Sequence, residues 1–87
     1  MTITFPPVRG VYTVNTTVAW PAEVDGEQIT CEISTEALMD HFGATSMDRA
    51  NLEAAFTNHR VTIENRARRL IRARAMGGRC LLVTADF

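Results

Sequence analysis

The residues best suited to binding chemistry are seven arginines between residues 60 and 79, a segment whose only acid is Glu64. Four of them lie close together in the run RARRLIR, namely Arg66, Arg68, Arg69 and Arg72. Guanidinium groups form charge-assisted and often bidentate hydrogen bonds with phosphates and carboxylates. The segment could therefore contact RNA or DNA, an acidic protein partner or a second copy of the chain, or it could be the solvated outer face of a helix.

The two histidines, His41 and His59, are the other side chains that could do chemistry near neutral pH. Both fall on expected helix faces that also carry leucine and phenylalanine, and Asp40 or Cys31 could complete a metal site beside them. Zinc sites use three or four ligands, often at a characteristic spacing, and this chain has no such spacing. We therefore predict two partly buried histidines with satisfied hydrogen bonds, and neither a metal nor a cofactor. The sequence does not say whether the two rings meet.

The two cysteines are weak candidates for nucleophiles. Cys31 falls in the middle of an expected strand, where burial would raise the pKa of its thiol, and Cys80 has only Arg79 beside it in the chain. We expect two buried, reduced thiols. The sequence contains no GxSxG motif, no glycine-rich phosphate loop and no paired-carboxylate motif. It therefore predicts no catalytic residue, no enzymatic activity and no small-molecule substrate.

The length and the charge distribution of the chain limit the classes of protein to which it can belong. Eighty-seven residues make one domain, residues 1–87, with 46% hydrophobic and 22% charged residues. Residues 1–59 carry two arginines against eight acids, a net charge of −6, whereas the arginine-rich segment is strongly positive. No apolar run is long enough for a transmembrane helix, and the first residues lack the features of a signal peptide. We expect a cytoplasmic protein without membrane contact.

A β-hairpin is the clearest local prediction. Apolar residues alternate along residues 18–24, and Asp25-Gly26 is a favourable two-residue turn because both positions tolerate positive φ. Placing Val24 opposite Glu27 pairs Trp20 with Cys31 and puts every apolar residue of both strands on one face. Pro21, which cannot donate a hydrogen bond, should mark an edge or a bulge.

The remaining elements follow from caps and periodicity. Ser34 or Thr35 can begin a short helix that ends at Gly43. Thr45 with Asp48 resembles a capping box that opens one long helix running to about Met76. Its buried stripe is expected to comprise Leu52, Phe56, His59, Ile63 and Leu70. Short strands are expected near residues 3–5 and 11–14, and a last strand at residues 80–83, which residues 84–87 could extend.

The predicted order is β-β-β-β-α-α-β. This order is typical of an α+β fold, here a single small domain with a mostly antiparallel sheet and a short and a long helix packed on one face.

Several short motifs carry a resemblance to a known family. They are Phe5-Pro6, Trp20-Pro21-Ala22, Asp25-Gly26, Cys31-Glu32-Ile33-Ser34, Glu36-Ala37-Leu38, His41-Phe42-Gly43-Ala44 and the final Leu82-Val83-Thr84-Ala85-Asp86-Phe87. With these, the chain resembles domain-of-unknown-function family 1488, the Shew3726-like small bacterial proteins. The resemblance implies an α+β fold and a bacterial cytoplasmic setting, and it supplies no catalytic residue.

The leading functional prediction is a non-enzymatic interaction or accessory domain, either with a protein partner or as a homodimer. The acidic N-terminal part and the basic segment would let two surfaces meet with complementary charge. The alternative is RNA or DNA binding through Arg66, Arg68, Arg69 and Arg72. Against it stand a near-neutral net charge of −1, a pI of about 6.1 and few aromatic residues that could stack on bases.

Overall fold

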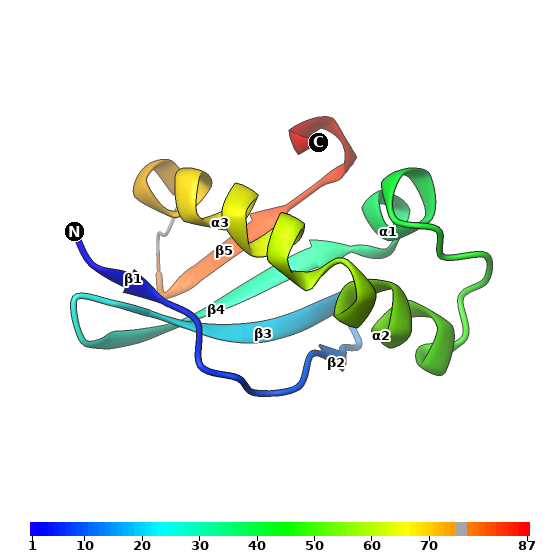
Figure 1. Cartoon of the computed structure of the whole chain (residues 1–87), viewed down its shortest axis with the longest axis horizontal. Helices are drawn as coiled ribbons and strands as arrows, with labels where there is room; N and C mark the ends of the chain where they lie inside the picture. Colours follow the sequence, from blue (N-terminus) through cyan, green and yellow to red (C-terminus); the bar gives the residue numbers. More distant parts are fainter. Residues whose placement is uncertain (75–76) are drawn as a thin grey trace.

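A five-stranded sheet carries helices on one face (Figure 1). The computed structural model describes residues 1–74 and 77–87. Its elements are β1 (Ile3–Thr4), β2 (Val11–Tyr12), β3 (Thr17–Val24), β4 (Glu27–Ser34), α1 (Thr35–His41), α2 (Arg49–Asn58), α3 (Arg60–Arg74), β5 (Arg79–Leu82) and the 3-10 helix η1 (Thr84–Asp86). Three of the four strand pairings are antiparallel, and β4 with β5 is the parallel one. The predicted α+β class and mostly antiparallel sheet are confirmed.

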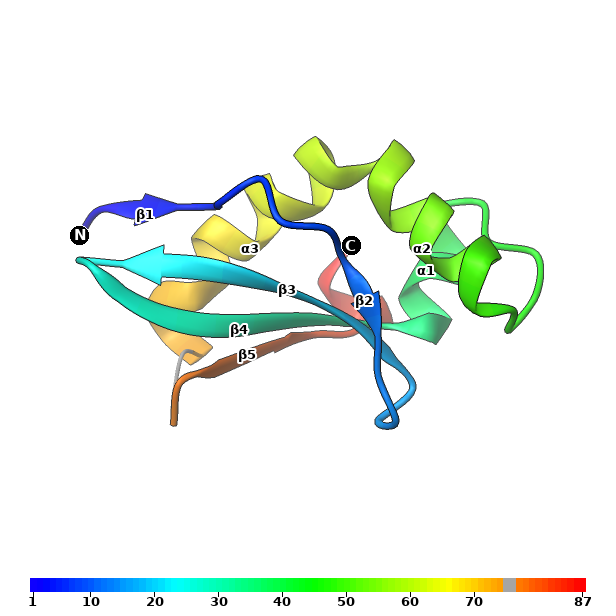
Figure 2. The same ribbon diagram turned by 90° about the horizontal axis from the view of Figure 1, so that it is seen from below.

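The β3–β4 hairpin has the predicted register. Val24 faces Glu27 and Trp20 faces Cys31, so that both apolar faces coincide. Asp25 and Gly26 form the turn with φ values of 51° and 86°. Both β1 and β2 pair with the other side of β3 (Figure 2). Pro21 falls between the two stretches that they pair with, where an N–H donor is not needed.

Helix α1 begins and ends where the sequence indicates. Its N-cap is Ser34, whose Oγ accepts a hydrogen bond from the backbone N–H of Ala37 at 3.1 Å. After the helix Gly43 has a φ of 77°, and the next backbone N–H, of Ala44, returns to the carbonyl of Leu38 at 3.1 Å. This left-handed C-terminal turn is one that glycine makes without strain.

The single long helix is wrong, because the chain forms two helices with a break at His59. The backbone N–H of His59 bonds to the carbonyl of Phe56, and its φ of −120° leaves the helical range. A straight helix of about 30 residues would be about 45 Å long, whereas the longest dimension of the molecule is 35 Å. The bend lets both halves bury their apolar sides, with Phe56 before it and Ile63 after it fully buried.

The ends of the predicted long helix also differ. Its N-cap is Asp48, which makes no side-chain capping bond, and the expected capping box does not form. Instead Oδ1 of Asn51 accepts hydrogen bonds from the backbone N–H groups of Thr45 and Ser46. The predicted end at Met76 lies outside the described residues. Beyond β5 the chain turns into η1 rather than extending the strand, since Asp86 accepts a hydrogen bond from the backbone N–H of Val83 at 2.8 Å.

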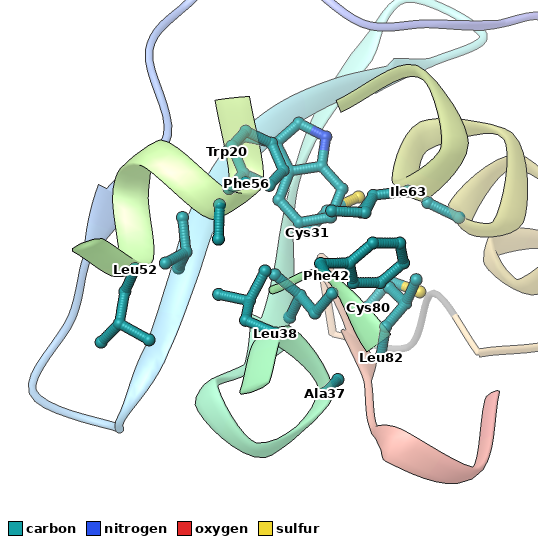
Figure 3. Packing of buried hydrophobic residues seen from close by; sticks show 14 of the residues in the cluster. Trp20, Cys31, Ala37, Leu38, Phe42, Leu52, Phe56, Ile63, Cys80 and Leu82 are labelled. Carbon is teal, nitrogen blue, oxygen red and sulfur yellow. The ribbon is translucent and has the colours of Figure 1, made fainter. Parts of the chain in front are cut away.

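The core lies between the sheet and the helices (Figure 3). Trp20 is 1% exposed, and its ring centroid is 4.7 Å from that of Phe56. The predicted helical stripe is buried at Leu52, Phe56 and Ile63, but His59 is exposed and Ala67 and Ile71 replace Leu70 as the most buried positions. None of the described helices combines the length and the apolar character needed to cross a bilayer.

The parallel pairing of β4 with β5 brings the two cysteines together. Cys31 and Cys80 are register neighbours, although 49 positions separate them in the chain, and both are fully buried free thiols. The predicted burial of both cysteines is confirmed. Their adjacency is a consequence of the return of the chain over α3, which the sequence spacing does not reveal.

Candidate functional site

A surface hollow of about 440 Å³ lies where α3, the end of α1 and the last residue of the chain meet. Figure 1 shows the C-terminal end between α3 and α1. The hollow is lined by seven residues: His41, Phe42, Thr62, Asn65, Arg66, Arg69 and Phe87. We call it the arginine–aromatic hollow. Its volume falls in the range of about 300–1,000 Å³ that is usual for small-molecule and cofactor sites.

One wall of the hollow is a polar stripe on α3. Thr62, Asn65, Arg66 and Arg69 follow one another at spacings of three, one and three, so they share one side of the helix. The buried residues of α3 are Ile63, Ala67 and Ile71, which hold the opposite side against the core. The helix is therefore fixed by its apolar side, and it presents the stripe at a defined orientation.

The other wall is aromatic. The rings of Phe42 and Phe87 meet edge to face at 5.0 Å between centroids, and the His41 ring lies 5.9 Å from that of Phe87. Phe42 is only 8% exposed and forms the floor, whereas Phe87 is half-buried and His41 is exposed. Nε2 of His41 lies 3.1 Å from the carbonyl oxygen of Thr84. Because a carbonyl only accepts, this nitrogen carries the proton, and the contact fixes the ring.

Three of the seven arginines of the basic segment already have acidic partners. The ion pairs are Arg60 with Glu64, Arg74 with Asp86, and Arg79 with Glu32. Arg60 also anchors the N-terminal segment, because its guanidinium donates to the carbonyl oxygens of Pro6 and Val8 at 3.1 and 2.7 Å. These arginines serve the fold, and they are not free to bind a partner.

The four predicted contact arginines separate into two groups. Arg66 and Arg69 line the arginine–aromatic hollow, and within residues 1–74 and 77–87 neither makes a hydrogen bond or an ion pair. Arg68 stacks on the ring of Phe5 at 5.1 Å and donates to Oδ1 of Asn65 at 3.1 Å. It is directed away from the rings of the hollow by these contacts.

Arg72 neither lines the arginine–aromatic hollow nor takes part in the contacts of Arg68. It lines a second hollow near the hairpin turn, together with the acids Asp25 and Glu27. The four arginines are therefore not one binding face, since only Arg66 and Arg69 combine with the rings.

Both histidine rings have Phe42 as a neighbour. The ring centroid of Phe42 is 6.3 Å from that of His41 and 5.3 Å from that of His59. Both are exposed rather than partly buried, which corrects the prediction. In the part of the chain that the structure describes, no three His, Cys, Asp or Glu side chains gather as a metal ion would require.

The buried titratable groups serve the fold. Burial raises the pKa of the Cys31 thiol to about 12, and burial also raises the pKa of Cys80. The hydrogen bond from Arg79 holds the pKa of Glu32 below its ordinary value, with Thr17 as a second donor. The pKa of Glu53 is lowered chiefly by the backbone N–H of Tyr12, 2.9 Å away. None of these groups lines the arginine–aromatic hollow.

Sequence reasoning missed most of the hollow. The spacing of Thr62, Asn65, Arg66 and Arg69 is a visible helical stripe, so part of this wall could have been read from periodicity. No local signal places Phe87 beside Phe42, because 45 positions separate them and α2, α3, β5 and η1 intervene.

Comparison with known proteins gives a family and a fold. Residues 3–82 match the family described as "Protein of unknown function (DUF1488)", and the chain belongs to this family. It is similar to the crystal structure of a protein of unknown function from the DUF1488 family of Shewanella loihica PV-4, with 24% sequence identity and a TM-score of 0.78. The match covers 94% of each chain, and it shows the fold. No curated protein matches the chain.

Proposed function

We propose that this member of DUF1488 is a non-enzymatic accessory domain of the bacterial cytoplasm that acts by binding an anionic partner. The binding site is the arginine–aromatic hollow. One observation carries the proposal: Arg66 and Arg69 line the same hollow as three aromatic or imidazole rings, and neither has an ion-pair partner in the described residues. A guanidinium without an acid of its own is available to a phosphate or carboxylate from outside.

A protein partner with an acidic surface, or a second copy of the chain, is the first candidate. The acidic N-terminal part of the chain supports it, because complementary charge favours association. Ion pairs inside the domain weaken this support. Arg79 already neutralises Glu32, and Glu53 is paired with both Arg9 and Arg49. The charge division is thus partly satisfied within one chain.

Single-stranded nucleic acid or a nucleotide is the second candidate, and the rings favour it. The sequence argued against this class because aromatic residues are few. The fold gathers three of the available rings, His41, Phe42 and Phe87, beside the two unpaired arginines. Bases stack on such rings whatever their identity, whereas an acidic protein surface needs no ring to stack on.

Fluorescence anisotropy with two labelled probes tests the proposal. The probes are a short oligouridylate and an oligoglutamate peptide, each titrated with wild type, with the double variant Arg66→Gln/Arg69→Gln, and with Arg72→Gln. Arg72 is the matched control, since it lies on the same helix but lines another hollow. We expect at least one probe to bind to the wild type. The double variant should lower the affinity for that probe tenfold or more, and the Arg72→Gln control should keep it within twofold of wild type.

Two results would count against the proposal. One is the absence of binding by both probes even at low salt, and the other is a loss of affinity in the control as large as that in the double variant. Circular dichroism of each variant confirms that the fold is intact. Light scattering at high protein concentration tests self-association separately, because a strict monomer would remove the homodimer.

A further inference from the structure

We infer that the arginine–aromatic hollow binds one nucleoside 5′-monophosphate unit, with the base against the rings and the phosphate on Arg66 and Arg69. The inference rests on the proposed function and narrows it to one ligand class. Three features of the hollow support it: its size, the charge and donors of the α3 wall, and the accessible rings.

The size of the hollow limits the ligand to one unit. A volume of about 440 Å³ holds a single small molecule. Proteins that follow a single strand use a longer charged groove, with about 4–16 nucleotides for each binding fold. In the described part of α3 no such groove continues past the hollow, because Arg68 stacks on Phe5 and Arg72 lies near the hairpin turn beside acids. The geometry favours one nucleotide over a track of several.

The α3 wall matches one phosphate monoester. Residues three apart on a helix have Cβ atoms about 5–6 Å from each other, so the long side chains of Arg66 and Arg69 can converge on one group. A phosphate monoester carries a charge of about −1.5 to −2 at neutral pH, which two guanidinium groups balance. A single carboxylate would leave one of the two arginines without a partner. The charge of the site thus favours phosphate.

Two neutral donors lie on the same wall. Oδ1 of Asn65 accepts a hydrogen bond from Arg68 at 3.1 Å, so this contact fixes the amide and leaves its NH₂ group free to donate. Thr62 adds a hydroxyl one turn earlier on the same stripe. Asp86 is bound by Arg74 at 2.6 Å and by the backbone N–H of Val83 at 2.8 Å. The charge of Arg66 also acts on this carboxylate, but more weakly than these two contacts, and no ion pair joins Arg66 to Asp86 in the described residues.

The aromatic wall offers two accessible rings over a buried one. Phe42 is nearly buried and holds Phe87 edge to face, while Phe87 and His41 remain open to solvent. The contact between His41 and the carbonyl of Thr84 keeps the imidazole in place before any ligand arrives. Preorganised rings lose little conformational entropy on binding, which favours stacking of a flat base. An acidic peptide would gain nothing from this wall.

Isothermal titration calorimetry with matched probes tests the assignment. The probes are adenosine 5′-monophosphate, adenosine, inorganic phosphate, and an oligoadenylate with either a 5′-phosphate or a 5′-hydroxyl end. We expect the monophosphate to bind at least tenfold more tightly than adenosine or inorganic phosphate. The affinity for the monophosphate should fall as the salt concentration rises, because salt screens the attraction between the phosphate and the two guanidinium groups.

Variants assign the two halves of the ligand to the two walls. Arg66→Gln/Arg69→Gln should weaken the monophosphate tenfold or more, while Arg72→Gln should leave it within twofold. Phe87→Ala and, independently, His41→Ala should weaken the monophosphate severalfold and leave inorganic phosphate unchanged. Circular dichroism and the urea midpoint of each variant check that the hollow is tested in a folded protein.

The outcomes separate this inference from the broader proposal. Equal affinity for inorganic phosphate and the monophosphate, or arginine-dependent binding of the oligoglutamate peptide alone, would overturn the nucleotide assignment and leave anion binding standing. Absence of binding by every probe would overturn both. Tight binding of the 5′-phosphorylated strand, with tenfold loss for the 5′-hydroxyl strand, would support the assignment and identify a strand end as the source. Binding of the free monophosphate at least tenfold tighter than that of the phosphorylated strand would support the assignment and identify a free nucleotide as the source.

Discussion

Replacing Trp20 by phenylalanine, and separately by alanine, probes the centre of the core. Trp20 is 1% exposed and lies 4.7 Å from Phe56, yet its Nε1–H finds no acceptor among the described residues. Truncation of a buried tryptophan to alanine costs about 3–5 kcal/mol, and the lost aromatic pair adds about 0.5–1.5 kcal/mol. The alanine variant should therefore lose a large part of the few kcal/mol that stabilise a domain of this size.

The phenylalanine variant separates packing from hydrogen bonding. The smaller ring in Trp20→Phe lowers the packing contribution to the free energy of unfolding by about 1–2 kcal/mol. It also removes a buried N–H without a partner, and such a group costs about 1–3 kcal/mol. The two effects nearly cancel, so we expect the free energy of unfolding to stay within about 1 kcal/mol of wild type.

Urea unfolding followed by far-ultraviolet circular dichroism measures both variants, because each removes the only tryptophan and with it the fluorescent probe. The midpoint and the slope should be fitted together, since a changed slope would indicate a changed unfolded state. If Trp20→Phe loses as much stability as Trp20→Ala, the indole N–H is satisfied in solution. The reasoning from an unpartnered donor would then be refuted.

Three further predictions concern positions away from the arginine–aromatic hollow. Gly10→Ala should lower the free energy of unfolding by about 1–3 kcal/mol, because a Cβ atom there would lie 2.6 Å from Cδ2 of the buried Phe56 ring. Arg79 pairs with Glu32 and keeps the pKa of this carboxyl low in the folded protein. The ion pair therefore contributes its full stability at a pH above the ordinary pKa of about 4.5, and this contribution is lost as the pH falls through the lowered pKa of the folded state. Urea midpoints across that range should therefore fall for wild type and fall less for Glu32→Gln. Cys31 and Cys80 should not react with a thiol reagent in the native protein at mildly alkaline pH, and both should react in urea.

Each of these has an opposing result. An alanine at position 10 without loss of stability would mean that the helix above it yields easily. If Glu32→Gln leaves the fall of the urea midpoint at acid pH unchanged, other carboxyl groups are responsible for the loss of stability in acid. Rapid labelling of either thiol in the native protein would show that the sheet between β4 and β5 opens locally.

Local patterns predicted the parts of the fold that neighbouring residues decide. The hairpin follows from the alternation of apolar residues and from a turn that accepts positive φ, so Trp20 opposite Cys31 could be stated without a structure. The same holds for the start of α1 at Ser34 and its end before Gly43. Each depends on residues within a few positions of one another, where chain geometry leaves few alternatives.

The break at His59 shows where such reasoning stops. Helical periodicity continues through this residue, and nothing in its neighbours terminates a helix. The bend is set by the size of the sheet and by the need to bury Phe56 and Ile63 on either side of it. Periodicity specifies which side of a helix is apolar, but it does not specify how far a straight helix can follow a surface.

The sequence by itself determined the α+β class, the hairpin register, the burial of the thiols and a surplus of arginines after residue 59. Only the tertiary structure decided which arginines are free, because Glu32 and Asp86 reach Arg79 and Arg74 through the pairing of strands and the turn that follows them. It also placed Phe87 beside Arg66 and Arg69. The physical reason is that composition and spacing fix local conformation and total charge, whereas availability for binding depends on which distant groups the fold brings within hydrogen-bond distance.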